Sequence, residues 1–156
     1  MSGFAALPLL ARPIAAGRPL EIEPDPDRDQ ALAFSDYFVA RFTRPVCLRV
    51  GRGEESMVPT IVPGDVVVID QRPERRIRPK AGHIFAVNFA PLTGEAGGAL
   101  KRIEVSQGML IVASDNPDKV KYGTLVVPLS DGLNLLDVLK GEVVWRGQYV
   151  GSGKRK

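Results

Sequence analysis

The strongest constraint on folding is a proline-punctuated stretch, residues 57–64, followed directly by the apolar run 66–69. Pro59 and Pro63 fix the backbone angle φ and lack an N–H donor, so they exclude a helix through this stretch. Four consecutive β-branched residues bounded by turn residues are typical of a buried strand. The sequence therefore predicts a rigid turn, headed by Ser56, that leads into a core strand.

Short apolar runs separated by turn residues recur along the chain, which is the pattern of an all-β domain. The predicted strands cover residues 46–50, 66–69, 84–88, 99–105, 109–113, 125–128 and 142–150. With 156 residues, 44% of them apolar and 25% charged, the chain is long enough for one domain with its own core. We therefore predict a mostly-β fold with little helix.

Two segments have a less regular pattern. In residues 31–43 the phenylalanines recur at helical spacing, although part of the segment suits a strand, and we favour a short helix or loop. Residues 130–140 are predicted to hold one helical turn, capped by Ser130 or Asp131. Residues 106–108 are typical of a short hairpin connection.

Lys101 lies in the predicted strand 99–105. With a period of two, it shares a face with apolar residues, whereas Arg102 and Glu104 take the other face. If Lys101 is buried, desolvation lowers its pKa, and a neutral amine can accept the proton of a serine hydroxyl such as that of Ser56. The alternatives are a lysine whose head group reaches water and an ordinary turn serine.

Three motifs together resemble the LexA/UmuD/phage-repressor family of self-cleaving peptidases. They are Ser56-Met57-x-Pro59-Thr60, then Gly64-Asp65-x-Val67, then Lys101-Arg102. The same residues resemble type I signal peptidases less closely. The resemblance covers roughly residues 7–150, and the chain departs from the family pattern at Glu54-Glu55, where the family usually has Gly-Asp.

The resemblance implies the coiled β-sheet fold of the LexA C-terminal domain and of signal peptidases. It also implies catalytic roles: Ser56 as nucleophile, Lys101 as general base, and the backbone N–H groups of Ser56 and Met57 as the oxyanion hole. The bond that is cut would be Ala16–Gly17, within a Pro-Leu…Ala-Ala-Gly-x-Pro segment. A small alanine suits a tight pocket, and glycine lets the backbone turn sharply.

This reading divides the chain into three parts. Residues 1–30 form the cleavage-site segment and an acidic connector, with 21–30 as a possible hinge; residues 31–150 form the peptidase and dimerisation domain; residues 151–156 form a disordered basic tail. The implied function is self-cleavage that inactivates a transcriptional repressor, or activates a UmuD-like protein, in the DNA-damage (SOS) response. A homodimer and activation by a RecA–single-stranded DNA filament are also implied.

Several alternatives stay open. Only 16 residues precede the implied cut, so the helix-turn-helix domain through which LexA-like repressors contact DNA is not in this sequence. The chain is then a trimmed repressor, a UmuD-like accessory protein or a stand-alone dimerising regulator. A signal-peptidase-like protease acting on other chains, and a non-catalytic dimerisation module, are the remaining alternatives.

Composition argues against other classes of site. A single cysteine, Cys47, and a single histidine, His83, cannot make a disulfide framework or a typical zinc site, and no cofactor is expected. We interpret Cys47 as a structural strand residue and His83 as an ordinary strand-edge residue. The lone cysteine fits a reducing compartment. The first apolar stretch, residues 4–16, is too broken by prolines and arginine to span a bilayer, so we expect a cytoplasmic location without membrane contact.

Two further features, a basic cluster and the single tryptophan, could have either a structural role or a role in binding. The basic cluster at residues 72–80 is favoured as a solvated loop over a DNA-phosphate patch, because no aromatic residues are interleaved. Trp145 is interpreted as a core residue or a dimer contact.

Overall fold

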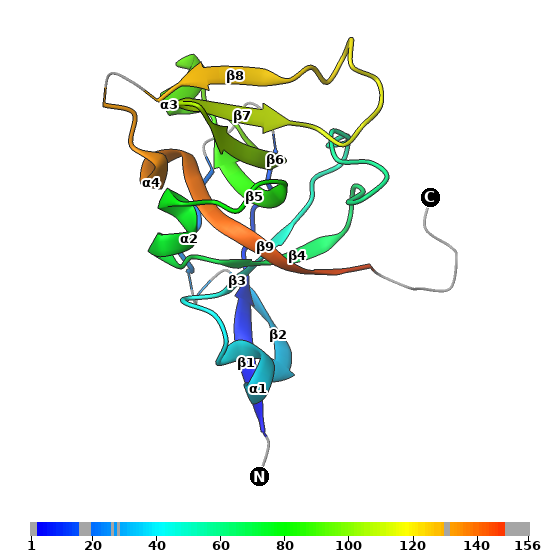
Figure 1. The fold of residues 1–156 in the computed structure, drawn as a ribbon. Coiled ribbons are helices and arrows are strands. Elements are labelled where there is room, and N and C mark those ends of the chain that lie inside the picture. The colour runs from blue at the N-terminus through cyan, green and yellow to red at the C-terminus, as the bar shows by residue number, and fades with distance from the viewer. Residues whose placement is uncertain (1–2, 16–19, 26, 28, 130–131, 149–156) are drawn as a thin grey trace.

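The computed structural model describes residues 3–15, 20–25, 27, 29–129 and 132–148. Among these residues, nine strands form one mixed sheet in the order β2-β1-β3-β4-β9-β5-β6-β7-β8 (Figure 1). The strands are β1 (Phe4–Leu9), β2 (Gln30–Ser35), β3 (Val46–Arg49), β4 (Val66–Asp70), β5 (His83–Asn88), β6 (Gly98–Ser106), β7 (Met109–Ala113), β8 (Leu125–Pro128) and β9 (Leu139–Gly147). The predicted mostly-β fold is confirmed.

Four one-turn helices connect the strands in the described part of the chain: α1 (Asp36–Val39), α2 (Pro73–Ile77), α3 (Ala90–Thr93) and α4 (Leu135–Val138). Neighbouring strands are antiparallel except for β1 and β3, which run parallel. The predicted hairpin at residues 106–108 is confirmed. Gln107 and Gly108 both have positive φ, the geometry that matches the twist of paired strands.

The first two strands were not predicted. β1 lies in the N-terminal segment that we read as an extended cleavage peptide, and β2 includes residues 31–35, where we favoured a helix or loop. The helix or loop is confirmed for the rest of that stretch: α1 covers residues 36–39, and residues 40–43 form a turn. Ser35 caps α1 by accepting a hydrogen bond from Phe38 N–H at 3.3 Å. The ring of Phe38 stacks on that of Phe34 at 5.3 Å and meets that of Phe42 edge-on at 5.0 Å.

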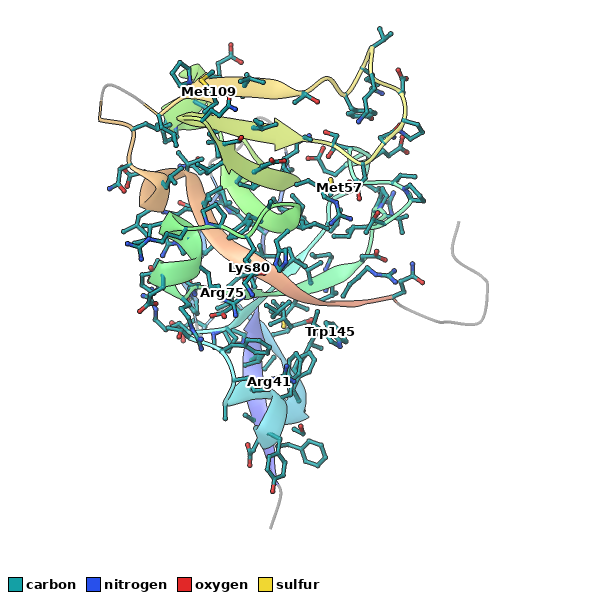
Figure 2. The ribbon with its side chains drawn as sticks, in the orientation of Figure 1. Arg41, Met57, Arg75, Lys80, Met109 and Trp145 are labelled. Atoms are coloured by element: carbon teal, nitrogen blue, oxygen red, sulfur yellow. The ribbon has the colours of Figure 1, made fainter. Side chains whose placement is uncertain are left out.

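The strands β1 and β2, with α1, form an arm that projects from the rest of the sheet (Figure 1). Leu7 and Leu9 of the arm pack with Cys47 and Val68 of the adjoining strands. Trp145 lies where the arm joins the sheet (Figure 2), and its ring meets that of Phe34 edge-on at 5.0 Å. Trp145 is therefore partly buried against the cluster that contains Cys47, and its alternative role as a dimer contact stays a prediction. Burial raises the pKa of the Cys47 thiol to about 11, as befits a structural cysteine.

Two other predictions are correct only in part. Part of the basic cluster at residues 72–80 is α2 rather than a solvated loop. Arg76 is buried and donates to the carbonyl oxygens of Leu136 and Leu139 at 2.7 and 2.6 Å. The helical turn predicted in residues 130–140 is confirmed as α4, but its cap is Asn134, whose side chain accepts from Leu136 N–H at 3.0 Å. The predicted caps Ser130 and Asp131 lie outside the described residues.

Arg75, also in α2, donates to Glu142 of β9 at 2.9 Å. His83, at the predicted strand edge, is the first residue of β5, and its Nδ1 contacts the other oxygen of the Glu142 carboxylate. α2 and β5 are thus tied to β9 by one buried carboxylate.

The chain between β1 and β2 makes a long excursion from the arm. Leu9 and Gln30 are paired across the β1–β2 ladder, so residues 10–29 leave and return at the same place. On the way, Ile14 forms a parallel bridge with Val50, just beyond β3. The excursion therefore carries the chain from the arm to the turn that holds Ser56.

Candidate active site

Ser56 stands at the head of the predicted turn between β3 and β4. The carbonyl oxygen of Met57 accepts hydrogen bonds from the N–H groups of Thr60 and Ile61 at 2.8 and 3.0 Å. Met57 (Figure 2) and Ile61 are buried in the same apolar cluster. The peptide bond between Val58 and Pro59 is cis. The turn is thus fixed from below by buried side chains, and the prediction of a rigid connection is confirmed.

A second turn, after β7, fastens the Ser56 turn from the side. The backbone N–H of Asn116 donates to the carbonyl oxygen of Ser56 at 2.9 Å, and its side-chain amide donates to that of Glu55 at 2.8 Å. Asp115 accepts from the Thr60 hydroxyl. The Arg102 guanidinium in turn donates two hydrogen bonds of 2.9 Å each to the Asp115 carboxylate. Their pairing lowers the pKa of Asp115 and raises that of Arg102.

Lys101 extends from β6 into a half-buried setting. Its Nζ donates to the hydroxyl oxygen of Ser114 at 2.6 Å, and Ser114 is itself buried. Burial lowers the pKa of Lys101 and is the largest influence on it; the charge of Lys119 lowers it further, while the Glu54 carboxylate raises it. The reading as a desolvated lysine on the core face is therefore favoured over one with its head group in water.

Ser56 and Lys101 line the same cavity, of about 410 Å³. Its other walls include Glu54, Tyr122 and the glycine-rich entry to β6. The fold therefore brings the two predicted catalytic residues, which are far apart in the sequence, to the same cavity. Among the described residues, the hydrogen-bond acceptor of Lys101 Nζ is the Ser114 hydroxyl and not that of Ser56.

The predicted oxyanion donors are the backbone N–H groups of Ser56 and Met57. Within the described residues, neither N–H donates to a protein acceptor. Ser56 lines the cavity that it shares with Lys101, whereas Met57 is buried and lines the adjoining small cavity with Ile14. The oxyanion-hole assignment of these two N–H groups stays a prediction.

Ala16 and Gly17, the predicted cleavage site, lie outside the described residues, but the chain on both sides is placed. On the N-terminal side, Ile14 is buried beside Ser56, and the carbonyl oxygen of Ala15 accepts from Gly98 N–H at 3.3 Å. On the C-terminal side, Leu20 packs so closely on Gly98 that a β-carbon there would lie 2.8 Å from the Leu20 β-carbon. Gly98 also lines the Ser56–Lys101 cavity.

The acidic connector folds back on the excursion. Asp29 accepts from the N–H groups of Ala11 and Asp25 at 2.9 and 2.7 Å. Between these segments lies a larger cavity, of about 500 Å³, walled by residues 10–12 and 20–25 with Asp29 and Lys140. It contains neither Ser56 nor Lys101, so it is separate from the candidate active site. The proposed hinge in residues 21–30 stays a prediction.

Sequence reasoning missed Ser114, Asp115 and Asn116 as parts of the site. Asp115-Asn116-Pro117 has an obvious turn sequence, but its role depends on β7 pairing with β6, which places Ala113 opposite Arg102. Once that register is known, Ser114 follows as a neighbour of Lys101. The basic tail, 151–156, lies outside the described residues.

In the part of the chain that is described, no three His, Cys, Asp or Glu side chains are grouped as a metal site would need. None of the helices there has the length and apolar character to cross a bilayer. A comparison with models of known protein families finds no match, and a comparison with curated proteins finds no relative.

Proposed function

We propose that this protein is a serine endopeptidase of the LexA type, which cuts its own chain between Ala16 and Gly17 with a Ser56–Lys101 dyad. The observation that carries the proposal is the shared cavity of Ser56 and Lys101. A desolvated lysine that lines the same cavity as a serine on a turn is compatible with nucleophile activation, which needs the amine to come within hydrogen-bond reach of the serine hydroxyl. The docking of Ala15 and Leu20 on Gly98 adds support, because it brings the flanks of the bond to that cavity.

The first step is acylation. Neutral Lys101 accepts the proton of the Ser56 hydroxyl as Oγ attacks the carbonyl carbon of Ala16, and the oxyanion accepts hydrogen bonds from the N–H groups of Ser56 and Met57. When the Ala16–Gly17 bond breaks, the Lys101 ammonium gives its proton to the departing Gly17 nitrogen. The products of this step are an Ala16 ester on Ser56 and a free amino group on Gly17.

The second step is hydrolysis of that ester. Lys101, neutral again, accepts a proton from water, whose oxygen attacks the Ala16 carbonyl carbon. The proton then passes to Ser56 Oγ as the ester bond breaks, and the Ala16 carboxylic acid that forms loses its remaining proton to solvent to give the carboxylate. Ser114, which holds Lys101 Nζ at 2.6 Å, keeps the amine oriented through both proton transfers. Because the substrate is part of the same chain, the entropy of encounter is already spent.

The proposal extends to the wider setting that the resemblance implies. The single mixed β-sheet is compatible with the coiled sheet of LexA C-terminal domains and signal peptidases. We place the protein as a homodimeric regulator of the DNA-damage response, in the cytoplasm, with a RecA–single-stranded DNA filament as the activator of cleavage. Such an activator acts by binding the cleavable arrangement more tightly than the resting one.

Intact mass spectrometry after incubation from about pH 7 to about pH 10 tests the proposal, because this range titrates a lysine of lowered pKa. Wild type should yield one product ending at Ala16 and one starting at Gly17, at a rate that rises with pH. Ser56→Ala and Lys101→Ala should stay intact, whereas Ser106→Ala, in the β6–β7 turn, should cleave like wild type. Wild-type protein that stays intact throughout this range would refute self-cleavage.

One observation favours a second candidate, a non-catalytic dimerisation module. The Glu54 carboxylate, at the position where the chain departs from the family pattern, raises the pKa of Lys101 and so opposes the neutral base. A serine-reactive fluorophosphonate probe separates the two candidates. Labelling of Ser56 that depends on Lys101 supports the peptidase, and equal absence of labelling in wild type and Lys101→Ala supports the module.

A further inference from the structure

β1 is an interior strand of the sheet, although it belongs to the N-terminal segment. It lies between β2 and β3 in the strand order. All six of its residues, Phe4–Leu9, are in register with β2, and Leu9 also pairs with Cys47 of β3. The N–H of Leu10, just beyond the strand, donates to the carbonyl oxygen of Cys47 at 3.0 Å. Removing β1 would leave unpaired backbone on both neighbouring strands.

The apolar side chains of this segment are buried as deeply as those of the central strands. Leu7 and Leu9 are 3% and 5% exposed and pack in the cluster that joins the arm to the sheet. Leu10 and Ile14 are 5% and 3% exposed and pack in the cluster beneath the Ser56 turn. All four precede the Ala16–Gly17 bond. Phe4, by contrast, is 80% exposed at the outer end of the strand.

The position of the bond relative to the ladder decides what a cut does. Ala16–Gly17 lies within the excursion of residues 10–29, whose two ends are held together by the Leu9–Gln30 pair. A cut there breaks no strand pair of β1 and exposes none of its buried side chains. It converts a hairpin with a long connection into two chains that share the same hydrogen bonds.

We infer that the space between β2 and β3 is a binding site for an extended apolar peptide, and that the N-terminal piece stays in it as a non-covalent strand after the chain is cut. The natural cut rests on the proposed function, but binding in this strand site does not. Cleavage and separation are then distinct steps. The N-terminal piece leaves only when β1 is peeled out, which exposes two strand edges and the apolar faces of Leu7 and Leu9.

The experiment makes the cut without the active site. In Ser56→Ala, a recognition sequence for an added protease is inserted between Ala16 and Gly17, a place where extra length costs little. After digestion, denaturing mass spectrometry should show two pieces, and native mass spectrometry and size exclusion should show particles that contain both pieces in equal number, two of each in a homodimer. Native particles made only of the C-terminal piece would overturn the inference. Failure of wild type to cut itself would concern only the proposed function.

Variants on the same strand test which side chains hold the piece. Leu7→Ala and Leu9→Ala should each speed its release by about 30-fold or more, as expected when a buried leucine is truncated. Phe4→Ala is the matched control and should change release by less than about twofold, since the Phe4 ring is exposed. If the piece leaves equally fast in all three variants, the assignment of its binding site between β2 and β3 would be overturned.

A competition measurement needs no variant. A fluorescent synthetic peptide of residues 1–16 is added to the nicked protein, and its incorporation is followed by anisotropy. Slow incorporation, limited by release of the resident piece, is expected for this peptide and not for one of the same composition in scrambled order. Equal binding of the scrambled peptide would show that the site does not recognise the sequence of this strand, and would overturn the inference.

Discussion

Lys101 and Arg102 are neighbours on β6, but their cationic groups lie in opposite settings. The Lys101 amine meets a neutral hydroxyl, that of Ser114, and its pKa is lowered; the Arg102 guanidinium meets the carboxylate of Asp115, and its pKa is raised. The pleat sends consecutive side chains to opposite faces of a strand. If the proposed mechanism holds, one strand supplies the base on one face and, on the other, the arginine that holds Asp115 beside the Ser56 turn.

The largest effect is expected from exchanging the two cations. Lys101→Arg keeps the positive charge but removes the base, because a guanidinium does not give up its proton near neutral pH. Self-cleavage should fall by at least about 10³-fold, the scale on which loss of a dyad member acts. Arg102→Lys should cleave at a rate within about tenfold of wild type, because a lysine keeps one charged hydrogen bond to Asp115. Equal losses in the two variants would show that β6 supplies no distinct base.

Asp115→Ala removes the clamp and leaves the base. The variant loses the pair with Arg102 and the bond from Thr60, so the Ser56 turn is held less firmly. Because the Arg102 side chain is 37% exposed, solvent screens the pair, and we expect a loss of only about 1 kcal/mol in the free energy of unfolding. Urea unfolding measures this loss.

In the same variant, the cleavage rate should drop at every pH while the midpoint of the pH profile stays where it is in wild type. A shifted midpoint with an unchanged plateau would mean that Asp115 acts on the base and not on the turn. Asp118→Ala, in the same turn but without a contact to Arg102 among the described residues, is the control.

The difference between the two faces of β6 also shows what sequence could predict. Alternation along residues 99–105 was enough to predict that Lys101 and Arg102 lie on opposite faces, although buried Leu100 breaks the pattern and both cations are partly buried. The prolines around Ser56 were enough to predict its turn. Both are local patterns. The partners Ser114 and Asp115 were missed because they depend on the β6–β7 register, which is set by packing across the hairpin and not by either strand alone.

β1 and β2 were missed for a related reason. Leu7-Pro8-Leu9 has few turn signals and contains a proline, which argues against an interior strand. Pro8 is accommodated in the β1–β2 ladder opposite Ala31. What makes this segment a strand is the presence of β2 and β3 on its two sides, together with the burial of Leu7 and Leu9, and these are long-range contacts.

A smaller effect is expected from the charges that surround Lys101. The Glu54 carboxylate raises the pKa of Lys101 and the Lys119 ammonium lowers it. Glu54→Gln should therefore lower this pKa, increase the neutral fraction at a given pH, and move the midpoint of the cleavage profile to lower pH. Lys119→Met should move it to higher pH. Shifts of about half a unit are typical of one partly solvated charge, and shifts of the same sign in both variants would contradict the assignment of Lys101 as the base.

The smallest effect is on stability and follows from the lowered pKa of Lys101 alone. In the unfolded chain this amine has its ordinary pKa, so between the folded-state value and the ordinary one the unfolded chain binds more protons than the folded chain. The free energy of unfolding should therefore rise with pH across that window. Below the folded-state pKa the cost of burying the ammonium is present in full, and above the ordinary value it is gone.

Urea unfolding of Ser56→Ala, which cannot cut itself, should show this rise at less than about 1.4 kcal/mol per pH unit, the limit for one proton. Ser56→Ala/Lys101→Met should lack it, and an equal slope in both proteins would mean that the Lys101 ammonium is as well solvated in the folded protein as that of any surface lysine.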